Sequence, residues 1–419
     1  MAAVTQAKAH FRKGTVMETT NNIDYLVSGA PTIESLVAHA PLQAVAPETL
    51  NFITQLSSRL LRSSYARKYP EIVALGFWLR EKHIVQLVSR FTNTNNEGWH
   101  KPLGCVVHYT PNNVDTMFVY SWICSLIMGN VNIVRLGSTA SEVRDVILHE
   151  LDELFSLPAH EQIAIRNMFL QFDKSSDLNF RLSELADARV IWGGDESILA
   201  IKKLPAKPRC RDISFADRYS VALINGDAIE SENDINQLAE LLWQDTKPFL
   251  QHACSSPKVV LWMGSTSEQS ALANRINELA TSTREGNAEG YAEHRANEHL
   301  VTCQLLQSQQ LATPPLCNES ICMLPVSEVN EKMLAEHPGE GMFFLLSVSS
   351  IEDITELLAD RLQTLTYWGV EKPALLKLLA SPSIIGVDRC VPVGQALSFS
   401  PDWDGYRLFS TLSRYVYLG

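Results

Sequence analysis

The stretch LGCVVHYTPNNVDTMFVYSWICSLIMGNVNIVRL, residues 103–136, decides the fold of this 419-residue chain. Its first part is an apolar, β-branched run typical of a buried strand, and Pro111 then turns the chain. An apolar helix follows, Gly129-Asn130 ends it, and a second apolar strand continues to Leu136. This order predicts a strand–helix–strand unit with its two strands parallel in one sheet.

Part of the same stretch has the composition of a membrane span. No charge occurs from Thr116 to Val134, a length at the lower limit for crossing a bilayer. Because Gly129-Asn130 is a helix-stop signal and Asn132 follows it, we expect a buried helix, a tight turn and a buried strand instead. No second such stretch exists, and MAAVTQAKAHFRKG at the start lacks a signal-peptide core, so we expect no membrane span.

Alternating strands and helices extend from this unit in the C-terminal direction. ARVIWGG and YSVALING belong to a first series, and after YSVALING the series restarts. In the N-terminal direction, residues 47–65 and 70–90 have helical periodicity, whereas residues 1–45 predict a weakly ordered or β-rich lead-in. Residues 281–299 are polar and predict exposed helix or loop. We expect an α/β protein with a lead-in and first domain over 1–225, a second α/β domain over 226–395, and a tail over 396–419 that returns to the first domain or makes an oligomer contact.

Composition narrows the possible functions. The chain is 46% hydrophobic with a formal charge of -12, and no basic cluster occurs, so a nucleic-acid partner is not expected. The eight cysteines form no C-x-x-C pair, and none has a histidine at zinc-ligand spacing. We therefore expect reduced thiols in a cytoplasmic protein and no metal site.

One cysteine, Cys254 in QHACSSPK, lies among small and polar residues. Lys247-Pro248 and Pro257-Lys258 flank it, which predicts a loop. A thiolate on such a loop is a strong nucleophile, and backbone N–H groups beside it can stabilise an oxyanion. A buried, inert cysteine is the alternative. These residues alone do not separate the two interpretations.

Three further features lie at predicted strand ends, where open α/β sheets bind ligands. Asn112 and Asn113 follow the first strand, and either can be a turn or helix-cap residue. Arg135 ends the second strand and can bind a phosphate or ribose, or simply be solvated. Gly193-Gly194 lets a ligand approach the backbone closely, although the chain contains no G-x-G-x-x-G.

The order of these motifs adds a resemblance. KPLGCVVHYTPNN, LIMGNVNIVRLGS, VIWGGDES, DRYSVALI and QHACSSPK together resemble the aldehyde dehydrogenase superfamily. QHACSSPK and the closing segment GVDRCVPVGQALSFSPDWDGYRLFSTLSRYV are most similar to its LuxC-type acyl-CoA reductases, the fatty acid reductases of luminous bacteria. The resemblance covers about residues 100–419 and implies a Rossmann-type cofactor domain followed by a catalytic α/β domain.

The resemblance also implies roles for particular residues. Cys254 matches the nucleophile, and Asn113 matches the asparagine whose amide completes the oxyanion hole. Arg135 stands where many relatives have a lysine that contacts the cofactor ribose. Gly193 and Gly194 match the glycine turn near the cofactor. Glu340, in GEGMFFLL, matches a glutamate that positions the nicotinamide ribose.

Two departures from the superfamily pattern are informative. Phe215 aligns with the position of the glutamate that activates water, and its apolar side chain would protect a thioester from hydrolysis. Ser138 occupies a position where NAD-preferring members carry a glutamate. The loss of that carboxylate beside Arg135 favours NADPH.

The resemblance therefore implies NADPH-dependent reduction of an acyl thioester, acyl-CoA or acyl-protein, to an aldehyde through a thioacyl-enzyme on Cys254. His252 is a candidate proton donor, although a loop histidine is more often a hydrogen-bonding residue. Two alternatives remain: an acyltransferase that uses the same cysteine without reduction, and a non-catalytic scaffold for an acyl-protein synthetase. Such a synthetase is also a possible partner of the reductase, and we expect a homo-oligomer.

Overall fold

The structure is a computed structural model that describes residues 23–93, 98–111, 114–284, 289–352, 354 and 360–418. The chain divides into two compact units. Unit 1 comprises Met1–Ala216 and Ser400–Gly419, and unit 2 comprises Asp217–Phe399. The boundary thus precedes the strand YSVALIN, whereas the sequence interpretation placed it after this strand at residue 225. The reason is that this strand is a central member of the second sheet.

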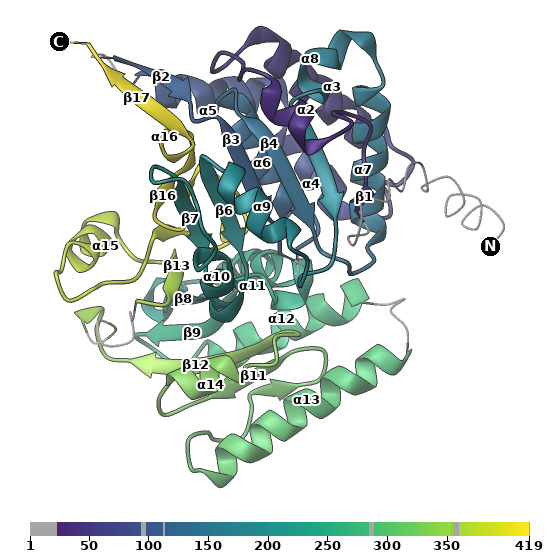
Figure 1. Cartoon of the computed structure of the whole chain (residues 1–419). Coiled ribbons are helices and arrows are strands. Elements are labelled where there is room, and N and C mark those ends of the chain that lie inside the picture. The colour runs from purple at the N-terminus through teal and green to yellow at the C-terminus, as the bar shows by residue number, and fades with distance from the viewer. Residues whose placement is uncertain are drawn as a thin grey trace. The chain divides into compact units, whose positions relative to one another are not determined.

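Unit 1 contains a six-stranded sheet in the order β1-β5-β4-β3-β6-β7 (Figure 1). β1 is antiparallel to β5, and the other neighbours are parallel. The chain moves outward from β3 first to one side and then to the other, which is doubly wound topology with its switch point between β3 and β6. The strands are β1 (Asp24–Tyr25), β3 (Cys105–Tyr109), β4 (Val131–Leu136), β5 (Asn167–Gln171), β6 (Ala188–Trp192) and β7 (Arg211–Phe215).

Helices surround this sheet: α2 (Ile33–Ala38), α3 (Pro47–Arg62), α4 (Pro70–Trp78), α5 (Glu81–Asn93), α6 (Met117–Ile127), α7 (Glu142–Phe155), α8 (Glu161–Ala164), α9 (Leu178–Leu185) and α10 (Asp195–Lys202). The predicted helix over 70–90 is in fact two helices, α4 and α5. The His83 ring Nδ1 donates to the Trp78 carbonyl oxygen at 2.7 Å. That oxygen would accept from the N–H of residue 82 in an unbroken helix.

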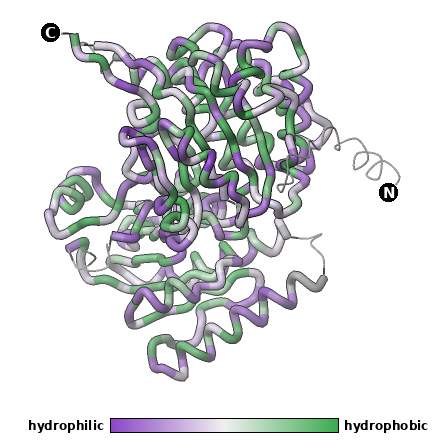
Figure 2. Tube along the Cα trace, viewed as in Figure 1, coloured by the Kyte–Doolittle hydropathy of each residue, from purple (hydrophilic) through white to green (hydrophobic). Residues whose placement is uncertain are grey.

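The stretch that decides the fold forms β3, α6 and β4 as expected. α6 is buried along most of its length, and Figure 2 shows hydrophobic residues concentrated along the strands of the first sheet. Gly129 ends the helix with φ +80, and a Cβ there would lie 2.3 Å from the Leu42 carbonyl oxygen. The Asn130 amide then accepts from Leu103 N at 2.7 Å and donates to the Leu412 oxygen at 2.8 Å. No described helix is long and apolar enough to cross a membrane.

Unit 2 contains a seven-stranded sheet in the order β10-β11-β12-β9-β8-β13-β14. Among the described strands of this sheet, only β10 is antiparallel to its neighbour. The strands are β8 (Tyr219–Asn225), β9 (Pro257–Met263), β10 (Cys317–Asn318), β11 (Cys322–Pro325), β12 (Met342–Val348), β13 (Leu362–Trp368) and β14 (Arg389–Pro392). The second predicted series of strands and helices is this sheet and its helices.

The helices of unit 2 are α11 (Glu232–Thr246), α12 (Gln269–Arg284), α13 (Glu289–Ser308), α14 (Glu331–Ala335) and α15 (Lys372–Leu379). The predicted exposure of residues 281–299 is wrong for α13 at two places. Arg295 is 8% exposed and His299 is fully buried, because this face of α13 lies against the unit. The segment IEDITELLADRL, residues 351–362, has the periodicity of a helix, but much of it falls outside the described residues.

Residues 400–418 belong to unit 1. They form β15 (Asp402–Trp403), β16 (Tyr406–Arg407), α16 (Leu408–Thr411) and β17 (Ser413–Tyr417). β17 pairs antiparallel with β2 (Gly98–Pro102), so that Tyr417 lies opposite Gly98. The Arg211 guanidinium donates to the carbonyl oxygens of Thr411 and Ser413, both at 2.7 Å, and holds this segment against β7.

Candidate active site

The carboxyl ends of β3 and β6 flank the switch point of the first sheet, where such sheets leave a crevice for a ligand. Tyr109, at the end of β3, pairs with Ile191 of β6 and with Arg135 of β4. Thr110 donates from both N and Oγ1 to the Arg135 carbonyl oxygen, at 3.2 and 3.0 Å. The structure thus brings Arg135 and the glycine turn after β6 to one sheet edge. Asn113, like Asn112, lies outside the described residues.

Arg135 is only 9% exposed. Its Nη2 donates to the Phe172 carbonyl oxygen at 3.2 Å, and its guanidinium carbon lies 5.4 Å from the centroid of the Phe172 ring. Burial lowers the pKa of Arg135, and nearby Tyr109 and Asp173 oppose this effect. The buried Nε has no hydrogen-bond partner among the described residues. A fixed guanidinium with an unused donor suits a ligand that carries oxygen acceptors.

Gly193 and Gly194 leave room beside the backbone. A Cβ on Gly194 would meet no atom within 4 Å, and one on Gly193 would meet only Ser197 Cβ, at 3.4 Å. Gly194 is the N-cap of α10, whose first turn contains Asp195 and Glu196. Because these carboxylates occupy the positive end of the helix, the turn suits an uncharged ring better than a phosphate.

Ser138 is exposed just beyond β4. The residue before it, Gly137, is buried, and its carbonyl oxygen accepts from Arg144 Nη1 at 2.7 Å. Ser141 caps α7, because its side chain accepts from Arg144 N at 3.1 Å. Arg144 therefore fixes the backbone that presents Ser138, a role that sequence reasoning did not identify.

Phe215 ends β7 and is 3% exposed. Its ring stacks on Trp192, with centroids 3.8 Å apart and planes at 12°, and meets Tyr406 edge-on at 5.5 Å. The position aligned with a water-activating glutamate thus holds a ring packed between two aromatic side chains.

The loop that carries Cys254 connects α11 to β9 in unit 2. It begins with a short 3-10 turn, η3 (Pro248–Gln251). Phe249, Leu250 and Gln251 have φ values of 54, 52 and 66. Left-handed backbone costs about 1–2 kcal/mol per non-glycine residue, so three in succession require support from neighbouring groups.

Gln251 supplies much of that support. Its side chain is fully buried, and Nε2 donates to the carbonyl oxygens of Pro257 and Met342 at 2.7 and 2.8 Å. Its Oε1 accepts from Gly341 N at 2.9 Å. One amide thus connects the start of the cysteine loop to the first residues of β9 and β12.

The backbone at Cys254 is held separately. Ser220 Oγ, on β8, donates to the Cys254 carbonyl oxygen at 2.7 Å and accepts from Thr364 N at 3.2 Å. Ser256 N donates to the Ala253 carbonyl oxygen at 2.9 Å. The Cys254 side chain is half-buried. The loop therefore lies where β8, β9, β12 and β13 begin, which is the amino-terminal edge of the second sheet.

The turn Gly339–Gly341 faces this loop. Glu340 N donates to the Leu250 carbonyl oxygen at 2.9 Å, and Glu340 Oε1 lies 3.3 Å from His252 Nε2. All three turn residues have positive φ, and a Cβ on Gly339 would lie 2.8 Å from His252 Cε1. The structure thus brings Glu340 to the cysteine loop through Leu250 and His252.

The predicted site residues fall into two groups. Cys254, His252 and Glu340 lie together in unit 2, whereas Arg135, Ser138, Gly193 and Gly194 lie at the sheet edge of unit 1. Sequence reasoning missed Gln251 and Ser220. Gln251 is the first residue of the predicted loop segment QHACSSPK, but its role depends on contacts with a strand 91 residues away.

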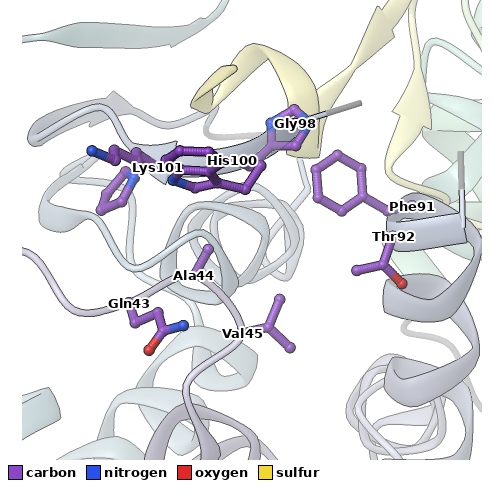
Figure 3. A pocket seen from close by; sticks show the side chains of 10 residues that line it. Gln43, Ala44, Val45, Phe91, Thr92, Gly98, His100 and Lys101 are labelled. Atoms are coloured by element: carbon purple, nitrogen blue, oxygen red, sulfur yellow. The ribbon is translucent and has the colours of Figure 1, made fainter. Parts of the chain in front are cut away.

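A separate cavity of about 540 Å³ lies in unit 1, away from these residues (Figure 3). It is lined by the 43–45 segment, the end of α5 and β2. His100 Nδ1 lies 2.6 Å from Ser413 Oγ, and its ring lies 4.5 Å from that of Phe91 and 5.3 Å from that of Tyr415. The lining of this cavity combines apolar and aromatic side chains with Gln43, Thr92 and Lys101, and it includes none of the predicted site residues.

The two doubly wound units have the fold of aldehyde dehydrogenases. A 1-pyrroline-5-carboxylate dehydrogenase from Thermus thermophilus is similar with a TM-score of 0.62 at 13% identity, over 100% of this chain and 95% of that one. An NAD-dependent aldehyde dehydrogenase from Sinorhizobium meliloti is similar with a TM-score of 0.61 at 12% identity, over 88% and 81% of the two chains. The fold class is therefore α/β and aldehyde-dehydrogenase-like.

Within that fold, residues 80–415 match the family model described as acyl-CoA reductase (LuxC). The chain belongs to this family of oxidoreductases. A curated relative, a long-chain acyl-protein thioester reductase from Aliivibrio fischeri, is 26% identical over 166 residues. The match covers 39% of this chain and spans 33% of the length of that relative.

Proposed function

We propose that this protein reduces an acyl thioester to an aldehyde through a thioacyl adduct on Cys254, with a nicotinamide dinucleotide as reductant. The observation that carries the proposal is the half-buried Cys254 thiol on a loop whose backbone is fixed by Gln251 and Ser220. Membership of the acyl-CoA reductase family supports the reaction class. The name of the Aliivibrio fischeri relative supports a long acyl chain carried by a protein, and the family description supports coenzyme A as the other carrier.

In the first step, the Cys254 thiolate attacks the thioester carbonyl carbon, a new C–S bond forms, and the carrier thiolate leaves. The Cys254 backbone N–H and the Asn113 amide are the proposed donors to the oxyanion. Hydrogen bonds to the Cys254 carbonyl and to Gln251 keep the thiol and its N–H in one geometry, which such a hole requires.

The adduct must then survive until it is reduced. Phe215 cannot deprotonate water, and its ring is packed against Trp192 and Tyr406. We propose that this substitution suppresses hydrolysis of the thioacyl group. Hydrolysis would give an acid and make the protein a thioesterase.

The residues at the sheet edge of unit 1 fit a dinucleotide. Gly193-Gly194 leaves space for a flat ring, and Arg135 offers a buried donor with no partner among the described residues. When bound, the reduced cofactor supplies the hydride. Arg135 with Ser138 in place of a carboxylate would accept a 2′-phosphate, and we therefore propose NADPH over NADH. Glu340 is the proposed contact to the nicotinamide ribose.

The proposal is tested with tetradecanoyl-CoA and intact-mass measurement. Without cofactor, wild type should gain one acyl group, and added NADPH should release an aldehyde that a hydrazine probe traps. Cys254→Ala should gain no acyl group. Cys317→Ala is the matched control, because Cys317 is also half-buried in unit 2, and it should acylate normally.

Three other outcomes contradict the proposal. Acylation of Cys254→Ala to the same extent as wild type would show that Cys254 is not the nucleophile. Acyl transfer to another thiol without loss of NADPH absorbance would indicate an acyltransferase. An absence of acylation together with binding to an acyl-protein synthetase would indicate a scaffold.

A further inference from the structure

Two buried thiols outside the site lie in contact in unit 2. Cys303, on α13, is 4% exposed, and Cys322, the first residue of β11, is fully buried. Their Sγ atoms are 3.6 Å apart, and both are free thiols. A disulfide needs about 2.05 Å between the sulfurs, so small side-chain movements would join them.

The other buried cysteines differ from this pair. Cys105 and Cys124 are buried, and burial raises the pKa of both thiols, that of Cys105 to about 12. Cys317, on β10, is half-buried, and its Sγ donates to the Ala273 carbonyl oxygen at 3.6 Å. Simple apolar packing therefore explains these cysteines but not the contact between Cys303 and Cys322.

The contact makes the two sulfurs chemically unequal. The hydrogen bond from Cys322 lowers the pKa of Cys303, whereas the same hydrogen bond and burial raise the pKa of Cys322. A thiolate reacts with peroxide faster than a thiol does, so Cys303 is the sulfur that an oxidant attacks first. Cys322 then stands at the position of a resolving thiol.

We propose that Cys303 and Cys322 form an oxidant-sensitive disulfide that joins α13 to β11. Hydrogen peroxide is the oxidant. The Cys303 thiolate attacks one peroxide oxygen, the O–O bond breaks, and sulfenic acid and hydroxide form. The Cys322 sulfur then attacks Cys303 Sγ and loses its proton, the S–O bond breaks, and water leaves. Overall, two thiols are oxidised and one peroxide is reduced to two waters.

Figure 1 shows α13 on the outside of unit 2, beside β11 and α14. Cys303 and Leu306 of α13 belong to the same buried cluster as Cys322 and Leu324 of β11, so a disulfide would fix a contact that already exists. Cys322 N also donates to the Gly341 carbonyl oxygen at 3.0 Å, and Gly341 N donates to Gln251. The disulfide would therefore attach α13 to a strand that supports the cysteine loop.

The experiment treats the full-length protein with hydrogen peroxide, alkylates the remaining thiols and digests it with a protease that cleaves after glutamate. Cleavage after Glu319 separates Cys322 from Cys303, and fragmentation of the linked peptides by mass spectrometry identifies the two bonded cysteines. We expect a peptide pair linked through Cys303 and Cys322 that has lost two hydrogen atoms and is restored by dithiothreitol. Peroxide damage at Cys254 adds oxygen instead and is distinguished by mass. Cys303→Ala and Cys322→Ala should each abolish the linked pair, whereas Cys317→Ala should keep it.

Three results would overturn the proposal. One is that both thiols remain alkylatable after unfolding of peroxide-treated protein. Another is a linked pair that contains Cys317 in place of Cys303. The third is a Cys303–Cys322 link that forms only in protein denatured before oxidation. This result would show that the contact in the folded protein does not direct the reaction. Because the measurement on wild type needs no variant, misfolding of a substituted protein does not affect it.

Discussion

The sheet edge of unit 1 and the cysteine loop of unit 2 place their candidate site residues by different means. At the sheet edge, Arg135 and Gly193 follow from the ends of regular parallel strands. In the loop, Cys254 follows three left-handed residues that a single buried amide holds in place. The sheet-edge residues are placed by regular strand pairing, whereas the geometry of the loop depends on the side chains of Gln251 and Ser220.

Gln251→Leu is expected to have the largest effect on both stability and thioacylation. This change leaves Gly341 N and the carbonyl oxygens of Pro257 and Met342 without their partner, which should lower the free energy of unfolding by about 3 kcal/mol. Thioacylation of Cys254 should fall about a hundredfold, because the nucleophile and its oxyanion donor lose their geometry.

Denaturant unfolding and single-turnover acylation measure both effects. Gln304→Leu, at an exposed position of α13, is the control and should match wild type in both. Wild-type acylation by a folded Gln251→Leu protein would show that the loop does not depend on this amide.

The two units should also differ in their response to pH. In unit 1, burial lowers the pKa of His108 from 6.5 to about 4. The unfolded imidazole takes up a proton that the folded one does not, so the His108 contribution to stability is complete above pH 6.5 and is lost as pH falls towards 4. In unit 2, burial raises the pKa of Asp245 from 3.8 to about 7. The folded carboxyl keeps a proton that the unfolded one releases, so stability falls as pH rises from 3.8 to about 7.

Each contribution changes stability by up to about 1.4 kcal/mol per pH unit, and the two oppose each other over nearly the same pH range, so they largely cancel in wild type. In denaturant unfolding, His108→Gln should leave stability falling as pH rises, because only Asp245 then titrates and the hydrogen bond to Asn132 Oδ1 can persist. Asp245→Asn should leave stability falling as pH falls, because only His108 then titrates. If neither variant changes the pH profile, burial does not set these protonation states.

Ser138→Glu tests the sheet edge itself. A carboxylate at this exposed position near Arg135 should repel a 2′-phosphate and weaken NADPH binding about tenfold relative to NADH, a change of about 1.4 kcal/mol. Cofactor titration by fluorescence measures the ratio. Thr139→Glu, one residue further along and also exposed, is the matched control. An equal effect of both substitutions would mean that general charge, and not this position, selects the cofactor.

The smallest effect concerns backbone conformation. Leu250 has φ 52, so Leu250→Gly should be more stable than Leu250→Ala by about 1 kcal/mol, because only glycine adopts left-handed backbone freely. Leu241, half-buried within α11, should show the reverse order, with glycine about 1 kcal/mol below alanine. Urea unfolding of the four variants measures both differences. The same order at both positions would contradict the left-handed conformation at Leu250.

The contrast between regular strand ends and a loop held by distant side chains also explains which features the sequence could predict. Apolar runs bounded by turns predicted β3, β4 and β6, and the superfamily resemblance is confirmed by the family match. The sequence did not predict β7, because the charged residues Arg211 and Asp212 interrupt its apolar pattern. Asp212 binds the buried Arg189 guanidinium of β6 at 2.6 and 2.7 Å, a partner that no local pattern reveals. The hydrogen bonds of Gln251 to Gly341 and Met342 were invisible for the same reason, since they join segments far apart in the chain.

The return of residues 400–418 to unit 1 determines the order in which the protein can fold as it is synthesised. β2 pairs with β17, and the Asn130 amide binds the Leu412 carbonyl oxygen 282 residues later. Unit 2 is continuous over Asp217–Phe399, so all its strands emerge from the ribosome before the last strand of unit 1 does. Domains generally fold as units during synthesis, and contacts of such long sequence separation form slowly. Unit 2 therefore completes its fold first, while unit 1, although begun earlier, waits for the final segment.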